Sequence, residues 1–208
     1  MKSLYLIRHG QSVANIGGKS IPDIEIPLTV AGQKQAQELV KKFSISPSKI
    51  YSSELLRAKQ TAQVFAHLYQ IPSETLTILN EFSYLGFENI NGMDGQERGK
   101  LAQLYWENAT IDYRDHHDSD CFQDFLDRVD LFIKRIESFN DNSLFFGHGI
   151  WIALLAWRLL GCPIETTLDI KSFRQFQTAL PLDNTVIYKL SISQDGVKQL
   201  QKFDLFSQ

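Results

Sequence analysis

The chain has 208 residues, which fits one large domain or one domain with an insertion. Hydrophobic residues make up 43% and charged residues 22%, as in an ordinary globular protein, and the net charge of −3 argues against a nucleic-acid partner. The longest apolar stretch, IWIALLAW, is too short to cross a membrane, and two cysteines suggest no disulfide framework, so we expect a cytoplasmic protein.

Up to residue 80, short apolar runs alternate with helical patterns. Thr29 is a suitable N-cap for the first helix, and Pro72 lies where the second helix must already have ended. In chain order, the sequence predicts a strand at 4–7, a helix at 28–43, a strand at 49–53, a helix at 54–70 and a strand at 75–79.

The next segment breaks this alternation. Glycines at positions 86, 92, 95 and 99 interrupt the pattern, and DYRDHHDSD at 112–120 is a polar loop. Between them, one helix is predicted near 97–108. We therefore expect a single domain over 1–208 with an inserted helical or lid segment at about 82–120.

The C-terminal part returns to regular elements. It predicts a helix at 121–139, a strand at 143–148, an apolar helix at 149–161 and a hairpin with strands at 184–192 and 197–203. Strands that alternate with helices predict an α/β fold, here a three-layer α/β/α sandwich with a mostly parallel central sheet.

Charged and imidazole side chains follow four of the predicted strands. Arg8 and His9 come after the first strand, Arg57 after the second, Glu81 after the third and His148 at the end of the fourth. Ligands of open α/β sheets bind beyond the carboxyl ends of the strands. The sequence therefore predicts two histidines, two arginines and one carboxylate at the same rim.

This set of side chains suits phosphoryl transfer. Arginine forks match the oxygens of a phosphoryl group, and a neutral histidine can attack phosphorus. A second histidine, in its protonated form, can neutralise charge, and a glutamic acid can protonate the leaving oxygen and then activate water. Gly149, next to His148, allows the backbone to approach an anion and is included among the phosphate-binding residues.

Four segments then resemble one family. LIRHGQSVAN, PLTVAGQKQAQEL, SSELLRAKQTA and FFGHG resemble, in order and approximate spacing, the motifs of the histidine phosphatase superfamily, the phosphoglycerate mutase-like group with an RHG signature. The resemblance covers nearly the whole chain and is weakest over 82–120. It implies that His9 is the phosphorylated nucleophile, that Arg8 and Arg57 clamp the phosphate, and that His148 completes the pocket.

The resemblance also implies a proton donor and a further phosphate ligand. Asn15 matches the asparagine after the RHG motif, and Glu81 matches the proton donor. The sequence after Glu81 departs from the common FGxWEG pattern of the family, which leaves Glu88 as the alternative proton donor. Asp120 stands where many relatives carry glutamate. The family needs no metal and no nucleotide cofactor, so no cofactor is expected.

The leading hypothesis is a phosphomonoesterase that acts on a small phosphorylated metabolite through phosphohistidine. A phosphoglycerate mutase of the same family is the alternative, but between Glu81 and Cys121 the chain offers only three cations, Arg98, Lys100 and Arg114, which favours hydrolysis. A non-catalytic phospho-ligand binding module would have lost His9, His148 or the acid. A metallohydrolase would place its cation beside two arginines.

The remaining expectations concern partners. The adjacent His116 and His117 diverge in any regular element, so DHHDSD is interpreted as a solvated loop and not as a metal site. A small phosphorylated substrate is expected, without nucleic acid or membrane, and a homodimer is left open. Aromatic residues of the insertion point to an apolar or ring-bearing leaving group: Phe82, Tyr84, Phe87, Tyr105 and Trp106.

Overall fold

A six-stranded sheet forms the centre of the protein, for which a computed structural model describes residues 1–205. The strand order is β3-β2-β4-β1-β5-β6, with parallel pairing from β3 to β1 and antiparallel pairing from β1 to β6. The strands are β1 (Lys2–Arg8), β2 (Lys49–Ser52), β3 (Ser73–Thr75), β4 (Ser143–Gly147), β5 (Ile187–Ile192) and β6 (Lys198–Lys202).

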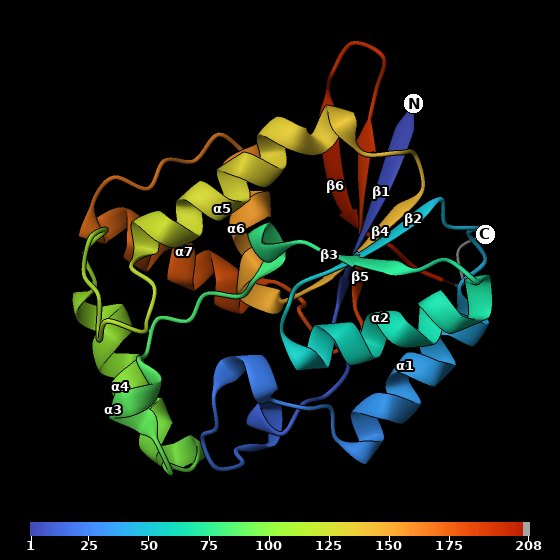
Figure 1. Cartoon of the computed structure of the whole chain (residues 1–208). Helices are drawn as coiled ribbons and strands as arrows, with labels where there is room; N and C mark the ends of the chain where they lie inside the picture. Colours follow the sequence, from blue (N-terminus) through green and yellow to red (C-terminus); the bar gives the residue numbers. More distant parts are fainter. Residues whose placement is uncertain (206–208) are drawn as a thin grey trace.

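Helices cover both faces of this sheet (Figure 1). α1 and α2 lie on one face, and α5, α6 and α7 lie on the other. The helices are α1 (Val30–Lys42), α2 (Leu56–Tyr69), α3 (Phe87–Ile90), α4 (Gly95–Asn108), α5 (Phe122–Arg135), α6 (Gly149–Leu159) and α7 (Thr167–Ala179). The structure thus confirms the predicted three-layer α/β/α sandwich.

The alternation of side chains along β1 explains the two cores. Leu4 and Leu6 pack into the cluster under α5, α6 and α7, whereas Tyr5 and Ile7 pack into the cluster under α1 and α2. Successive side chains of a strand point to opposite faces, so an apolar run that is buried on both faces belongs at the centre of such a sheet. β1 therefore lies between β4 and β5.

Helix starts follow the local sequence. The Thr29 side chain accepts a hydrogen bond from the amide of Gly32 at 3.0 Å, which confirms it as the N-cap of α1. α2 ends at a left-handed Gln70 (φ 55°), before Pro72.

Two elements differ from the sequence prediction. The third strand is Ser73–Thr75 and not 75–79, because its pairing with β2 ends at Thr75 and a 3-10 helix at Thr77–Leu79 follows. That turn still buries Ile78 and Leu79, which is why an apolar run looked like a strand. The prediction also missed α7, although Thr166 and Asp169 form a capping box at its start.

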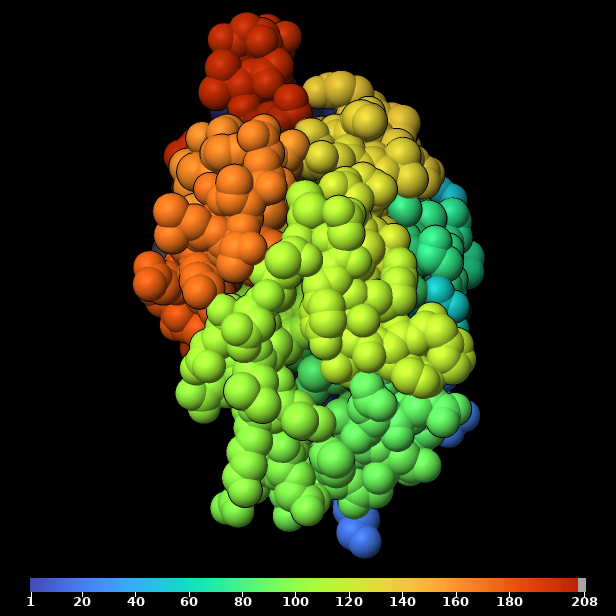
Figure 2. Space-filling model, turned by 90° about the vertical axis from the view of Figure 1, so that its left-hand side faces the viewer, coloured from blue at the N-terminus to red at the C-terminus, as the bar shows by residue number. Residues whose placement is uncertain are grey.

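The segment 82–120, called the insertion below, holds α3 and α4, where one helix was predicted. It packs against α7 and α5 on the face shown in Figure 2, in which the insertion is green, α7 orange and α5 yellow. In Figure 1, α3 and α4 lie beside the blue loop that follows β1. Within residues 1–205, no helix is long and apolar enough to span a bilayer.

Candidate active site

The two histidines meet where β1 and β4 end side by side. Arg8 pairs with Gly147 in the parallel register, and the amide of His9 donates to the carbonyl of Gly147 at 3.0 Å. The rings of His9 and His148 are then 5.2 Å apart between centroids. The sequence-predicted rim therefore exists, and it brings both histidines together.

His9 is held as a neutral ring. Its Nδ1 lies 2.6 Å from the carbonyl of Gly10, which can only accept, so Nδ1 carries the hydrogen and Nε2 has a free lone pair. The ring is 4% exposed. Burial, with the charge of Arg57 as the next cause, lowers the pKa of His9 to about 3. The His9 ring is therefore neutral at ordinary working pH, with the lone pair of Nε2 available.

Arg8 presents a free donor to the same place. Its Nη1 donates to the carbonyl of Leu182, but its buried Nε has no hydrogen-bond partner within residues 1–205. A Cβ added to Gly149 would lie only 3.4 Å from that Nε, so the glycine lets the guanidinium pass across the start of α6. Buried donors are normally paired, so this one indicates a site for an anion.

Arg57 is buried in the first turn of α2, as predicted, but its partner was not predicted. Its Nη1 donates to the side chain and the carbonyl of Asp23, at 2.8 and 3.0 Å. The carbonyl of Arg57 accepts from Thr61, whose Oγ1 accepts in turn from the amide of Gly10 at 3.1 Å. α2 is thereby tied to the backbone directly after His9.

The Glu81 side chain contacts the N-terminus of α6. Its Oε2 accepts from the amide of Ile150, and its Oε1 from the amides of Trp151 and Phe82, each at 3.0 Å. Burial raises the pKa of Glu81, although the amide hydrogen bonds act in the opposite direction. Glu88, the alternative acid, is exposed on α3 and does not line the cavity described below.

Asn15 is connected to the backbone of His9 through Asn184. Its Oδ1 accepts from the amide of Ser12 at 3.0 Å and from Nδ2 of Asn184 at 3.1 Å, and the same Nδ2 contacts the carbonyl of His9. Thr185, with a left-handed φ of 64°, donates its amide to the carbonyls of Arg8 and His9. A β-branched residue is strained in this conformation, and such strain is frequent at functional sites.

The surroundings of the second histidine disfavour the protonated form that the sequence analysis considered. Burial, and next the charge of Arg57, lower the pKa of His148 well below its ordinary value. Three nearby arginines make a further positive charge unfavourable: Arg8, Arg57 and Arg128. Burial and these arginines therefore favour the neutral form of His148.

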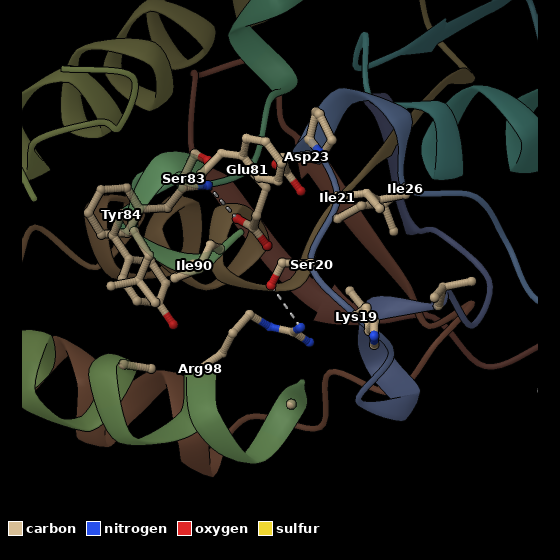
Figure 3. Close-up of a pocket in the computed structure, with 18 of the residues that line it drawn as sticks. Lys19, Ser20, Ile21, Asp23, Ile26, Glu81, Ser83, Tyr84, Ile90 and Arg98 are labelled. Carbon is tan, nitrogen blue, oxygen red and sulfur yellow. Dashed lines mark hydrogen bonds between the residues drawn. The ribbon is translucent and has the colours of Figure 1, made fainter. Parts of the chain in front are cut away.

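A cavity of about 550 Å³ has Arg57 and Glu81 in its wall, whereas Arg8, His9 and His148 are not among the residues that line it. Figure 3 shows Glu81 pointing into it, with Tyr84 and Ile90 on the insertion side and Ile21 on the side of the loop after β1. Most of the other lining residues are apolar or small: Val13, Ala14, Pro22, Ile26, Phe82, Leu85, Phe87, Gly95, Gly99 and Ala102.

Hydrogen bonds connect the two sides of this cavity. The amide of Ser20 donates to the carbonyl of Met93 at 2.9 Å, and the amide of Gly95 donates to the carbonyl of Gly17 at 3.0 Å. Nη1 of Arg98 contacts the carbonyl of Gly18 and the hydroxyl of Ser20, the contact drawn in Figure 3. We call these contacts, between the loop 13–26 and the insertion, the latch.

Sequence reasoning did not find three polar neighbours of the site. Asp23 lies in a loop without a motif, and Asn184 precedes the last strand pair. Ser53 stands in the SSELLRAKQTA segment but was not given a role. The only signal available for Ser53 was its position directly after a strand, at the same rim as the histidines.

Comparison with known proteins agrees with this geometry. Residues 4–204 match the histidine phosphatase superfamily (branch 1). The chain is 33% identical over 165 residues to an adenosylcobalamin/alpha-ribazole phosphatase of Escherichia coli K12, covering 78% of this chain and 81% of that protein. It is 28% identical over 169 residues to the probable phosphoglycerate mutase GpmB of Escherichia coli O1:K1, covering 78% of this chain and 77% of that protein.

A crystal structure shows the same fold. The alpha-ribazole phosphatase of Shigella flexneri superposes with a TM-score of 0.75 at 26% identity, covering 97% of this chain and 95% of that one. The match thus includes the insertion, where the sequence resemblance is weakest. The predicted family is confirmed: the chain belongs to the histidine phosphatase superfamily.

Proposed function

We propose that this protein is a phosphomonoesterase that works through a covalent phosphohistidine at His9. The observation that carries the proposal is the state of His9, a buried neutral imidazole whose free Nε2 belongs to a site lined by Arg8 and Arg57. Arginines would hold the phosphoryl oxygens, and the ring would attack without first having to lose a proton.

In the first step, Nε2 of His9 forms a bond to phosphorus while the bond between phosphorus and the leaving oxygen breaks. Glu81 gives its proton to that oxygen, and its raised pKa favours the protonated form that this step needs. Nδ1 keeps its hydrogen and donates it to the carbonyl of Gly10, and this hydrogen bond stabilises the positive charge that develops on the ring.

In the second step, water attacks phosphorus and the bond to Nε2 breaks. The Glu81 carboxylate accepts a proton from the water, so the enzyme returns to its starting state and inorganic phosphate leaves. Asn15 would orient the His9 loop through Asn184 and contact a phosphate oxygen. Gly149 would allow an oxygen to approach the start of α6.

The cavity indicates the class of leaving group. Its walls combine Ile21, Ile26, Tyr84, Phe87 and Ile90, which suit an apolar or ring-bearing body. Relatives named for alpha-ribazole phosphatase activity support the same class. We therefore place a monoester with a ring-bearing alcohol, and not a small triose acid, at the head of the candidate substrates.

The mutase alternative has less support. Of the three cations counted in the insertion, only Arg98 lines the cavity, and its Nη1 is already engaged by the latch. Arg114 pairs with Asp124, and Lys100 is exposed. A mutase needs free cations to hold a second acidic group of its intermediate, and the described residues of the insertion offer none that is unengaged in the cavity. Lys19, the one lysine in the cavity wall within residues 1–205, comes from the loop 13–26.

The first test is hydrolysis of aryl and nucleoside monophosphates, with 3-phosphoglycerate as the comparison, in excess chelator. We expect the ring-bearing esters to be hydrolysed in excess chelator, because no metal is needed. This turnover should disappear in His9→Ala, because the variant lacks the nucleophile. We also expect the enzyme to work in a reducing cytoplasm, since Cys121 and Cys162 are unpaired. Phosphoglycerate isomerisation without hydrolysis would refute the phosphatase and support a mutase. Equal turnover in His9→Ala and the wild type would show that His9 is not the nucleophile.

A further inference from the structure

A serine outside the motif residues contacts the second histidine. Ser53 follows β2 directly and is fully buried. Its Oγ lies 2.7 Å from Nε2 of His148 and accepts a hydrogen bond from the amide of Leu55 at 3.3 Å. A serine hydroxyl has one hydrogen to donate. Within residues 1–205, Nε2 of His148 is the acceptor in reach of that hydrogen.

This contact determines where His148 carries its own hydrogen. In a neutral imidazole, one nitrogen donates and the other accepts. Because Nε2 accepts from Ser53, the hydrogen must be on Nδ1. Nδ1 of His148 is buried and has no hydrogen-bond partner within the described residues. A buried donor of this kind indicates a ligand that is to be bound.

A second unpartnered donor lies in the same place. Nε of Arg8 is also buried and unpaired in the described part of the chain, and it passes beside Gly149, the neighbour of His148. The ring of His9 is 5.2 Å from that of His148. A tetrahedral anion bonded to His9 could therefore accept hydrogen bonds from both donors at once.

We infer that Ser53 is a positioning residue, which holds His148 as the neutral Nδ1–H tautomer so that the ring donates a hydrogen bond to the phosphoryl group. The inference rests on the proposed function, because it assigns His148 a part in phosphoryl transfer. No proton leaves His148 in either step. Without the hydroxyl, the ring could place its hydrogen on Nε2, and the phosphoryl group would then face a lone pair.

The decisive measurement is nitrogen NMR of the full chain with isotope-labelled histidine. The chain has five histidines, and the His148 signals are identified by their loss in His148→Asn. We expect a protonated Nδ1 and an unprotonated Nε2 between about pH 5 and pH 8, the range in which an ordinary histidine titrates. A protonated Nε2, or a doubly protonated ring at the acid end, would overturn the inference.

Variants connect the tautomer to catalysis. Ser53→Ala should mix or reverse the tautomer and lower kcat about 10- to 100-fold with a smaller change in KM, and Ser53→Thr, which keeps the hydroxyl, should restore both. Ser52→Ala makes the same change at the buried neighbour and should alter neither readout. An unchanged tautomer and kcat in Ser53→Ala would contradict the inference.

The two proposals fail separately. The tautomer is read without substrate, so it is decided in the wild-type protein even if Ser53→Ala does not fold. An inactive wild type with the expected tautomer would refute the phosphatase and leave the role of Ser53 in holding the ring. An active wild type with the other tautomer would refute the role of Ser53 alone.

Discussion

At the scale of single residues, His9 and Glu81 have pKa values displaced in opposite directions. Burial lowers the pKa of His9 to about 3 and raises that of Glu81. Neutral His9 is thus available above about pH 3, while Glu81 keeps its proton to a higher pH than an ordinary carboxyl. Between these limits, His9 and Glu81 coexist in the protonation states that the proposed first step needs.

The pH profile therefore depends on Glu81. Activity should fall as pH rises through the raised pKa of Glu81, because the leaving oxygen then lacks its proton. Glu81→Gln should lower kcat about 100- to 10,000-fold for alkyl phosphates and remove this alkaline limb. With para-nitrophenyl phosphate, the burst of the first step should be much less affected, since this leaving group departs without a proton, whereas steady-state turnover still needs Glu81 as the base of the second step.

The matched control is Glu88→Gln, an exposed acid nearby, which should keep the wild-type profile. An equal slowing of the first step for alkyl and para-nitrophenyl esters in Glu81→Gln would show that Glu81 does not act as the acid. A loss confined to Glu88→Gln would transfer the role to that residue.

A close backbone approach controls the width of the cavity. A Cβ at Gly95 would lie 2.6 Å from Cα of Gly17, so Gly95→Ala must move α4 away from the loop 13–26. We expect KM for ring-bearing esters to rise severalfold, with little change in inhibition by inorganic phosphate. Gln96→Ala, in the same turn but exposed, should leave both unchanged. An unchanged KM in Gly95→Ala would show that the latch does not shape the cavity.

At the scale of elements, α5 positions the chain segment that carries Glu81. Asp120 accepts from Arg128 through two hydrogen bonds, at 2.9 and 2.6 Å, and from the amide of Ser83 at 3.0 Å. Arg128 also donates to the carbonyl of Glu81 at 3.2 Å. This bidentate pair therefore fixes the backbone on both sides of Phe82.

Aromatic packing completes this connection. Phe82 stacks on Phe125 of α5 with ring centroids 4.7 Å apart and an interplanar angle of 8°. It also meets Trp106 of α4 edge-on at 6.0 Å. Phe82, directly after the acid, thus connects the insertion to α5, and truncating it to alanine would remove a large buried ring.

Breaking the ion pair should affect both stability and catalysis. Arg128→Met leaves Asp120 partly buried without its cation, so we expect a loss of about 2 kcal/mol in the free energy of unfolding, after allowance for partial exposure, and a lower kcat. Urea unfolding and steady-state kinetics measure the two effects. Arg114→Met removes an exposed pair and should change the stability by less than about 1 kcal/mol. A stable Arg128→Met with full kcat would contradict the positioning role.

At the scale of the whole molecule, burying a neutral histidine makes folding depend on pH. The unfolded chain binds a proton at His9 below about pH 6.5, and the folded protein does so only near pH 3, so stability falls as pH drops between these values. The His9 contribution to that fall is on the order of 3 kcal/mol between pH 7 and pH 4.

Urea unfolding at several pH values tests this linkage. His9→Asn should show a shallower loss of stability than the wild type between pH 7 and pH 4, whatever its stability at pH 7. His67→Asn, which replaces an exposed histidine on α2, should keep the wild-type slope. Parallel slopes for His9→Asn and the wild type would mean that His9 is not buried in its neutral form.

The sequence predicted the site residues that stand at the ends of strands. Arg8, His9 and His148 could be placed at one rim because they stand at strand ends, and parallel strands share their carboxyl edge. Thr29 was recognised because a cap acts within its own turn. Asp23 and Ser53 could not be assigned, because their contacts join positions whose distance only the folded chain defines.

The misplaced third strand has the same explanation. The apolar run before Glu81 fits a buried turn as well as a strand, and only the end of its pairing with β2 at Thr75 decides between them. α7, by contrast, has a capping box and buried apolar residues three positions apart, Ile170 and Phe173, so the sequence did contain a helical signal there. The charge of His148 depends on burial and on arginines from three separate segments.

The central claim is that phosphate passes through His9, and trapping the intermediate tests it most directly. Wild-type protein turning over a ring-bearing phosphate ester is quenched in alkali, digested and analysed by mass spectrometry for a phosphoryl group. We predict that the group lies on Nε2 of His9 in the peptide that contains LIRHG, that it is lost in acid, and that it accumulates in Glu81→Gln with a good leaving group. Turnover without any phosphorylated His9 peptide, or with the phosphoryl group on another residue, would contradict the account.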